Sequence, residues 1–318
     1  MTQQLPIISI VIPCYNEALA LPKTVNVLLP LLNKMIEDNL ISASSYFLCC
    51  DDGSKDETWN IVCDLHAKDS RIKGISLAHN KGHQYALLAG LMTVKNSCDA
   101  AISIDADLQD DPTAIIDMIK EFINGKEIVY GVRSSRASDS WLKRTTAHAF
   151  YCFQNAMGLE TIYDHADFRL LSNRALCLLE EYGESNLFLR GIIPQIGLET
   201  GIITYERKER IAGKSKYSIK KMISFSIDGI TSFSAKPMRI IFLIGLLLLI
   251  IDVIVAGYVL TSYFTHNSIS GWASIMLSIW FLGSLILMAI GVVGEYIGKI
   301  FVEVKKRPRY AIKDTLID

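Results

Sequence analysis

Short apolar runs alternate with longer amphipathic stretches along the first 131 residues of the chain. The apolar runs are rich in β-branched residues and are bounded by turn residues, which predicts buried strands at 7–12, 46–50, 72–77, 100–104 and 127–131. The stretches between them carry apolar residues at helical spacing, which predicts helices at 19–38, 56–68, 83–95 and 112–124. Strands and helices that alternate in this way predict an α/β domain, built on a mostly parallel sheet covered on both faces.

Polar residues follow four of the five predicted strands directly, at 13–17, 51–56, 105–112 and 131–136. In a parallel sheet the carboxyl ends of the strands share one edge, and ligands bind beyond that edge. The four clusters therefore predict a single site at one rim of the sheet.

The last third of the chain has a different pattern. Between residues 240 and 298 the only Asp, Glu, Lys or Arg side chains are Asp252 and Glu295. Two apolar runs of membrane-spanning length are predicted there, at about 240–260 and 275–297. Lys and Arg residues flank both runs and are absent from the turn between them, which predicts that both chain ends are cytoplasmic. The alternative is a helical hairpin buried in a soluble protein.

A shorter amphipathic segment precedes the first run. Isoleucine, methionine and phenylalanine recur every three or four residues, opposite Lys220, Lys221 and Asp228. This pattern predicts a helix in the membrane interface, although a core helix would show the same spacing. The expected organisation is an α/β domain at 1–217, a juxtamembrane helix at 218–236, two transmembrane helices within 238–298 and a cytosolic tail at 299–318.

Composition narrows the class of protein. The 318 residues have a net charge of -1, and that balance does not fit a nucleic-acid-binding protein. No G-x-G-x-x-G or P-loop motif occurs, which argues against a dehydrogenase and a P-loop ATPase. The N-terminus lacks the features of a signal peptide, and the seven cysteines include no C-x-x-C pair. We therefore expect reduced thiols in a cytosolic domain.

The segment Asp105-Ala106-Asp107-Leu108-Gln109 ends the fourth predicted strand. Two carboxylates at one strand end can bind a divalent cation, and Mg²⁺ and Mn²⁺ prefer such oxygen ligands. The amide oxygen of Gln109 could add a third ligand. Acidic loops are often only solvated, but the density of acids here would be self-repelling without a cation.

The second predicted strand ends in Asp51-Asp52-Gly53-Ser54. A carboxylate in this place can accept a hydrogen bond from a base or a ribose, and glycine permits close approach of the backbone. An ordinary strand-to-helix turn with a capping Asp or Ser explains the same residues. The sequence does not decide between these two interpretations.

Together these motifs resemble those of the nucleotide-sugar glycosyltransferases of family 2, which have the Rossmann-like GT-A fold. Further segments are similar to the polyprenyl-phosphate glycosyltransferases, in particular the bactoprenol glucosyltransferases and, more distantly, dolichol-phosphate mannose synthase. The matching segments cover nearly the whole chain and lie at 13–17, 51–56, 79–84, 105–110, 131–133, 167–170 and 210–217, with the two terminal spans.

The resemblance implies a role for each matching residue. It implies donor contacts by Pro13, Tyr15, Glu17, Asp52, Ala106, Arg210 and Lys216, acceptor-phosphate contacts by Arg133 and Arg144, and metal ligands at Asp105, Asp107 and Gln109. Asp167 would lie at the reacting centre, as a base or as a group that orients the sugar. The implied cofactor is Mg²⁺ or Mn²⁺, and the implied assembly is a homo-oligomer, with a tetramer favoured.

The implied reaction transfers a hexose, most simply glucose from UDP-glucose, to undecaprenyl phosphate at the cytoplasmic membrane, with inversion at the anomeric carbon. A lipid phosphate has a second pKa near ~6 and is already nucleophilic at neutral pH, so a strong base is less necessary. Two alternatives are a processive polysaccharide synthase, although its usual Q-x-x-R-W motif is absent, and an inactive membrane-anchored scaffold that binds sugar nucleotides.

Overall fold

The computed structural model describes residues 5–133, 165–184, 187–206 and 271–317, with a few single positions between 241 and 254. The chain divides into two compact units. The first is made of Met1–Tyr151, Glu160–Tyr217 and Pro308–Asp318, and the second of Cys152–Leu159 and Ser218–Arg307.

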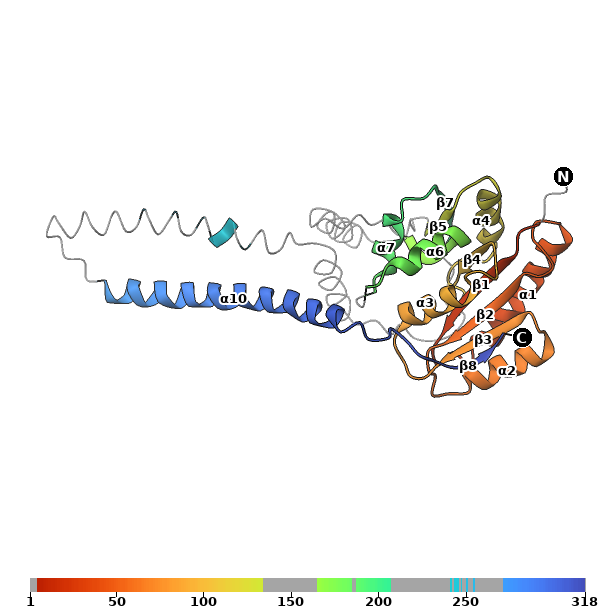
Figure 1. Ribbon diagram of the computed structural model, residues 1–318, viewed down its shortest axis with the longest axis horizontal. Coiled ribbons are helices and arrows are strands. Elements are labelled where there is room, and N and C mark those ends of the chain that lie inside the picture. The colour runs from red at the N-terminus through yellow and green to blue at the C-terminus, as the bar shows by residue number, and fades with distance from the viewer. Residues whose placement is uncertain are drawn as a thin grey trace. The chain divides into compact units, whose positions relative to one another are not determined.

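An eight-stranded mixed sheet forms the centre of the first unit (Figure 1). Its strands, in spatial order, are β7 (Thr200–Tyr205), β5 (Ile128–Arg133), β6 (His165–Ser172), β4 (Ala100–Ser103), β1 (Ile8–Cys14), β2 (Tyr46–Asp51), β3 (Ile72–Leu77) and β8 (Ile312–Leu316). The pairs β1–β2, β2–β3, β1–β4 and β5–β7 are parallel. β6 runs antiparallel to both β4 and β5, and β8 runs antiparallel to β3. The predicted α/β fold with a mostly parallel sheet is therefore confirmed.

The five predicted strands are β1 to β5, and the predicted helices correspond to α1 (Leu21–Glu37), α2 (Thr58–Lys68), α3 (His83–Val94) and α4 (Ala114–Ile123). Every residue of β1, β2 and β4 is buried, because helices cover both faces of a parallel sheet. α1 begins beside a proline, and its buried side chains recur at three- and four-residue spacing. The sequence did not predict β6, β7 and β8, nor the short helices α6 (Asn173–Glu181) and α7 (Leu189–Gln195).

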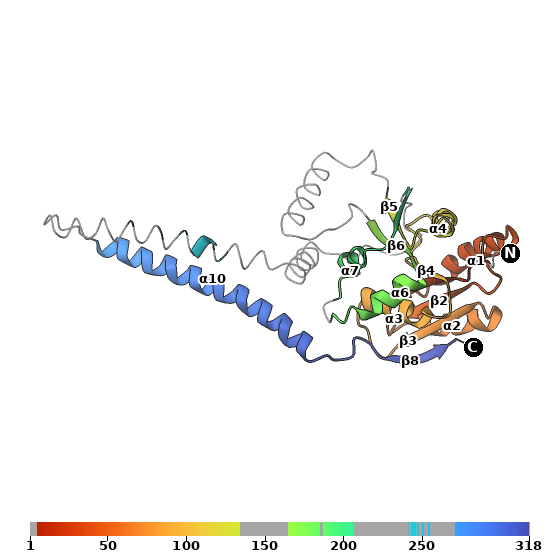
Figure 2. The same ribbon diagram turned by 45° about the horizontal axis from the view of Figure 1, so that its top comes forward.

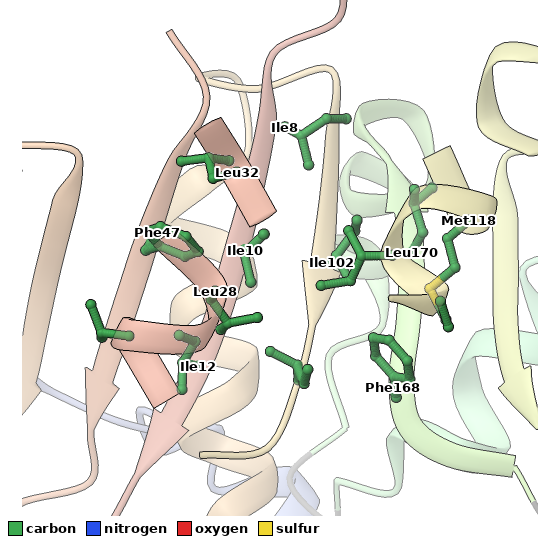
Figure 3. Close-up of a cluster of buried hydrophobic side chains, with 14 of the residues drawn as sticks. Ile8, Ile10, Ile12, Leu28, Leu32, Phe47, Ile102, Met118, Phe168 and Leu170 are labelled. Carbon is green, nitrogen blue, oxygen red and sulfur yellow. The ribbon is translucent and has the colours of Figure 1, made fainter. Parts of the chain in front are cut away.

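One face of the sheet packs against α1, α2 and α4 in a continuous apolar core. Side chains from alternate strand positions, such as Ile10, Phe47 and Leu170, meet Leu28 and Met118 of the helices (Figure 3). α3 packs on the opposite face, where Gly90 lies so close to the sheet that a Cβ atom would come within 2.3 Å of the Cys50 sulfur. The two helical layers hold the strand ends rigidly, which fixes the backbone of the rim.

The second unit contains α10 (Trp272–Val304), a helix that includes the second predicted span. Among the described residues, one helical stretch, Phe281–Val304, has the length and composition to cross a membrane. Most of the large apolar side chains described in this stretch are exposed, which is typical of a surface that another apolar environment covers. The helix continues past the predicted end near 297 because apolar residues still alternate with Lys299 and Glu303. The first predicted span falls mostly outside the described residues, and the two-span arrangement is not confirmed.

The tail expected to be a cytosolic extension at 299–318 has two structural parts instead. Its first residues complete α10, and residues 312–316 form β8, which pairs with the edge strand β3 (Figure 2). The amide of Ala78 donates to the carbonyl of Ala311, and the Lys73 ammonium donates to the carbonyl of Ile317. The tail therefore belongs to the sheet of the first unit.

Candidate active site

The strand directions bring the predicted site residues to one rim. β1, β2, β4, β5 and β7 end there, and β6 begins there because it runs in the opposite direction. Asp105, which follows β4, and Asp167, which lies near the start of β6, therefore meet although they are far apart in the sequence. The prediction that the polar clusters share one edge is confirmed for the described residues.

His83 lies between these two carboxylates at the first residue of α3. Its Nε2 atom is 3.6 Å from an oxygen of Asp105 and 3.6 Å from an oxygen of Asp167. Burial disfavours the charged imidazole, but the interaction with Asp167 and the charges of both carboxylates raise the pKa of His83 to about 9. The imidazole is therefore protonated at neutral pH in the metal-free chain.

Asp167 is the most heavily paired acid at the rim. Both oxygens of its carboxylate accept hydrogen bonds from Arg190: Nε lies 3.1 Å from Oδ1, and Nη2 lies 3.1 Å from Oδ2. Arg169, two residues along β6 and only 1% exposed, also donates to Oδ1. Burial alone would raise the pKa of Asp167, but Arg190, His83 and Arg169 hold that pKa well below its ordinary value.

The ionised carboxylate of Asp167 compensates the charge of the buried Arg169 guanidinium. Within the described part of the chain its Nε and Nη1 atoms have no hydrogen-bond partner, and burial lowers its pKa. A buried guanidinium with so few partners depends on the negative charge of Asp167. The carboxylate of Asp167 therefore stays ionised, and such a group is better suited to orient a substrate than to accept a proton.

Asp110 anchors the other side of the rim. One oxygen of this buried carboxylate accepts from Arg133 Nε at 2.9 Å, from Arg133 Nη2 at 2.8 Å and from the Tyr205 hydroxyl at 2.6 Å. Arg133 ends β5 and Tyr205 ends β7, so the ends of these two strands are tied to the loop after β4. Burial and the charge of Asp110 raise the pKa of Tyr205, which keeps its hydroxyl a donor.

We expect Asp110→Ala to be one of the most destabilising single changes at the rim. The substitution leaves the Arg133 guanidinium and the Tyr205 hydroxyl without their shared acceptor, and breaking a buried pair in this way costs about 3 kcal/mol. Thermal unfolding of the full chain in detergent would show a midpoint lowered by about 6–12 °C. Asp117→Ala is the matched control, because Asp117 forms an exposed pair with Lys120 that is worth less than about 1 kcal/mol. Equal midpoints for the two variants would contradict the anchoring role.

The loops expected to contact the nucleoside are joined to each other. The amide of Asn16 donates to Ser54 Oγ, the amide of Lys55 donates to Asn16 Oδ1, and the amide of Glu17 donates to Thr58 Oγ1. Pro13 is buried at the end of β1, whereas the side chains of Tyr15 and Glu17 are partly exposed. These contacts place residues 13–17 and 51–58 side by side, as the prediction requires.

Asp52 has a structural task in this region. It is buried, and its two oxygens accept from the amides of Lys81 at 2.7 Å and Gly82 at 2.8 Å. Gly53 has a φ of +63°, and a Cβ there would lie 2.8 Å from the backbone of His79. Asp52 therefore holds the 79–82 loop against the strand end, and its predicted contact with the nucleoside remains a prediction.

The loop after β4 has the donor chemistry of a divalent cation site. Asp107 accepts from the amide of Gln109 at 3.2 Å, and the carbonyl of Ala106 accepts from Thr24 Oγ1 at 2.5 Å, which secures the loop to α1. Burial and the surrounding carboxylates, including Asp167, Asp110 and Asp107, raise the pKa of Asp105. This excess of negative charge on the partly exposed carboxylates of Asp105 and Asp107 fits Mg²⁺ or Mn²⁺.

Protein ligands alone do not complete such a site. No group of three or more histidine, cysteine or acidic side chains in the described ranges is placed to hold a metal. Asp105 and Asp107, with the amide of Gln109, would leave open positions, and Mg²⁺ commonly fills these with water and phosphate oxygens. The donor set therefore fits a cation that arrives with a diphosphate.

Three predicted site residues, Arg144, Arg210 and Lys216, lie outside the described residues, as does the amphipathic helix. Sequence reasoning assigned no role to His83, Asp110, Arg169 or Arg190. The alternation in Asp167-Phe168-Arg169 could have indicated that the acid and the arginine share one face of a strand. Nothing in the local sequence signals Arg190, because its contact with Asp167 comes from tertiary packing.

The pKa of His83 leads to a test of this electrostatic cluster in metal-free protein. A histidine with a folded pKa of about 9 and an unfolded pKa of ~6.5 contributes its full stabilisation below the lower value. That contribution is lost as the pH rises through 9. In EDTA, the unfolding midpoint of the wild type should therefore fall more between pH 7 and 10 than that of His83→Gln. Parallel curves for the two proteins would show that the imidazole does not carry the charge.

Comparison with known proteins decides the family. The model of glycosyl transferase family 2 matches residues 9–178, which include β1 to β6 and α1 to α4. The chain belongs to glycosyl transferase family 2. It is therefore a glycosyltransferase, and the resemblance of the sequence motifs to this family is confirmed.

Relatives match along nearly the whole chain. The uncharacterized glycosyltransferase YkoT of Bacillus subtilis is 50% identical over 98% of this chain and 93% of its own length. An SfII prophage-derived bactoprenol glucosyl transferase of Shigella flexneri is 38% identical over 96% of this chain and 97% of its own. Among solved structures, the mannosyltransferase PcManGT of Pyrobaculum calidifontis, in complex with GDP-Man and Mn²⁺, covers 96% of this chain and 87% of its own at 14% identity and a TM-score of 0.44.

Proposed function

We propose that this glycosyltransferase transfers glucose from UDP-glucose to undecaprenyl phosphate at the cytoplasmic face of a membrane, with inversion of the anomeric centre. The observation that carries the proposal is the full-length similarity to the Shigella bactoprenol glucosyl transferase, which includes the apolar C-terminal region. A domain that acted only on water-soluble acceptors would have no use for that region.

The donor half of the site is assigned to the loops that follow β1, β2 and β4. Pro13, Tyr15, Glu17 and Asp52 would contact the nucleoside, and Ala106 the donor beside them. Asp105, Asp107 and Gln109 would hold Mg²⁺ or Mn²⁺. When bound, the cation would neutralise the diphosphate and stabilise it as a leaving group. Arg210 and Lys216 are proposed to close over the same diphosphate.

The acceptor half is assigned to the arginines. A lipid phosphate is mostly dianionic at neutral pH, so its oxygen attacks without prior removal of a proton. Arg133 and Arg144 would hold it, because the planar guanidinium matches two phosphate oxygens. The strongly lowered pKa of Asp167 favours a role in orienting the sugar over a role as base. Direct attack on an α-linked donor produces a β-linked lipid-phosphate sugar.

The membrane assignment rests on α10 together with the apolar run at 240–260. Two spans with basic flanks would keep the catalytic domain and both termini in the cytoplasm of an inner-membrane protein. This arrangement lets the prenyl tail of the acceptor stay in the bilayer while its phosphate reaches a water-soluble donor. A homo-oligomer, with a tetramer favoured, remains a proposal.

The direct test uses purified full-length protein in detergent with undecaprenyl phosphate, Mg²⁺ and a panel of radiolabelled nucleotide sugars. We expect label to enter the lipid phase from UDP-glucose, to require the divalent cation and to be absent with undecaprenol. The anomeric coupling constant of the product would report the β linkage. Label that entered a polymer, or no label from any donor, would contradict the proposed reaction.

A further inference from the structure

Two arginines at the rim are held in the same way. Arg133 donates its Nε and Nη2 to Asp110, and Arg190 donates its Nε and Nη2 to Asp167. A guanidinium held along this edge keeps a second edge, formed by Nη1 and the remaining hydrogen of Nη2. Among the described residues the Nη1 atom of Arg190 has no hydrogen-bond partner, whereas Arg133 also interacts with the Tyr205 hydroxyl. Each carboxylate therefore orients its arginine, and Asp167 leaves the other edge of Arg190 for an anion.

Arg190 and Arg169 pair with the same carboxylate but differ in solvent exposure. Arg169 is 1% exposed and serves the interior, whereas the Arg190 side chain is 41% exposed and that of Arg133 is 22% exposed. Arg133 ends β5, and Arg190 pairs with Asp167 of β6, the strand next to β5. The two partly exposed guanidiniums therefore belong to adjacent strands at the same rim.

The charges around Asp167 do not cancel. Its single negative charge faces two guanidiniums, those of Arg169 and Arg190. Arg169 is buried and Arg190 is partly exposed, so the uncompensated positive charge reaches the rim at Arg190, on the same rim as Arg133. Such a pair attracts a phosphate group.

The position of the pair in the sheet indicates which phosphate. The loops assigned to the nucleoside follow β1 and β2, on one side of β4. Arg133 ends β5, and Arg190 is the second residue of α7, on the other side of β4. Both views show α7 near β5 (Figures 1 and 2), and Figure 2 shows it near β6. The amide of Leu189 donates to Gln84 Oε1, which secures the start of α7 beside the start of α3. Because Arg190 also pairs with Asp167 of β6, its guanidinium lies on the side of β4 where β5 and β6 are, and not where β1 and β2 are.

We propose that Arg190 binds the phosphate of the acceptor together with Arg133, as one half of a two-guanidinium site in which Asp167 and Asp110 hold the arginines from behind. The inference rests on the proposed function, since it needs an acceptor that carries a phosphate. It also gives Asp167 a second task, which is to aim Arg190.

Steady-state kinetics of the full-length protein in detergent provide the first test. Arg190→Gln should raise the KM for undecaprenyl phosphate by about ten- to a hundredfold, because it removes charge-assisted hydrogen bonds, and should leave the KM for UDP-glucose nearly unchanged. Arg190→Lys keeps the charge without the fork and should recover part of the loss. Arg174→Gln is the matched control, since Arg174 is 69% exposed and pairs with Glu127 away from the rim.

Equilibrium binding separates this inference from the proposed reaction. Calorimetry with farnesyl phosphate and with farnesol, each in the presence of Mn²⁺ and UDP, measures the contribution of the phosphate without turnover. The wild type should prefer the phosphate, and Arg190→Gln should lose most of that preference while its affinity for UDP with Mn²⁺ stays the same. This result would stand even if the transferred sugar proved not to be glucose.

Two outcomes would overturn the inference. If Arg190→Gln weakened UDP binding instead, the arginine would belong to the donor. If it lowered kcat with both KM values and farnesyl phosphate binding unchanged, its only task would be to position Asp167. Unfolding midpoints identify any variant that fails to fold, and Arg190→Lys then provides the same comparisons.

Discussion

Asp105→Asn is expected to reduce sugar transfer by at least about 100-fold, with a fold that remains intact. The substitution removes a negative charge from a cluster of acids that repel one another, so it deletes a metal ligand without leaving a cation unpaired at high cost. Loss of a cation that stabilises the leaving group costs several kcal/mol of barrier, and each 1.36 kcal/mol is about tenfold in rate. Asp107→Asn should act in the same direction.

The measurement is kcat at saturating Mg²⁺ and Mn²⁺, together with Mn²⁺ affinity in the presence of UDP. Asp117→Asn is the control, because this carboxylate lies on α4 in an exposed pair with Lys120. The unfolding midpoint of Asp105→Asn should be equal to or above that of the wild type, since burial and neighbouring charges raise the pKa of Asp105. If Asp105→Asn and Asp107→Asn both bound Mn²⁺ with normal affinity, the assignment of the cation to this loop would be wrong.

Asp167→Asn is expected to have a large effect on both activity and stability. Loss of the Asp167 carboxylate leaves the buried Arg169 without an anionic partner and releases Arg190 from its ion pair. We therefore expect kcat to fall about 100-fold or more and the free energy of unfolding to fall by about 3 kcal/mol. Thermal unfolding and steady-state kinetics at several pH values would measure both. Asp117→Asn serves again as the surface control.

The pH dependence distinguishes the two roles considered for Asp167. Since its pKa is held well below the ordinary value, the carboxylate stays ionised throughout the range in which the protein is folded. An orienting anion then gives a wild-type rate with no acidic limb between pH 5 and 7 from this group. An acidic limb that disappeared in Asp167→Asn would identify a general base instead.

The sequence predicted the first half of the fold well because buried parallel strands consist of uninterrupted runs of apolar residues. β1 and β2 differ from their predicted bounds by only one or two residues. The later strands carry no such signal. β7 alternates exposed and buried positions at an edge of the sheet, β8 is largely polar, and β6 places Asp167 and Arg169 where a core strand would have apolar residues.

The candidate site shows the same division. Asp105 and Asp107 could be recognised from a short motif, because they follow a strand whose end is visible in the sequence. Asp167 could be recognised only through the resemblance of residues 167–170 to the family, since its strand was not predicted. Their partners could not be recognised in this way. Arg190 reaches Asp167 only because α7 packs beside β6, and Arg133 reaches Asp110 only because β5 and β4 run in the same direction. Such pairings are set by topology rather than by local pattern.

The strand β8 has a practical consequence for any work with this protein. It covers β3, whose outer edge would otherwise offer free amides and carbonyls to another chain. A shortened form that ends after α10, or a bulky fusion that displaces residues 312–316, would uncover this edge and invite precipitation through intermolecular pairing. An affinity handle for purification therefore belongs at the other terminus.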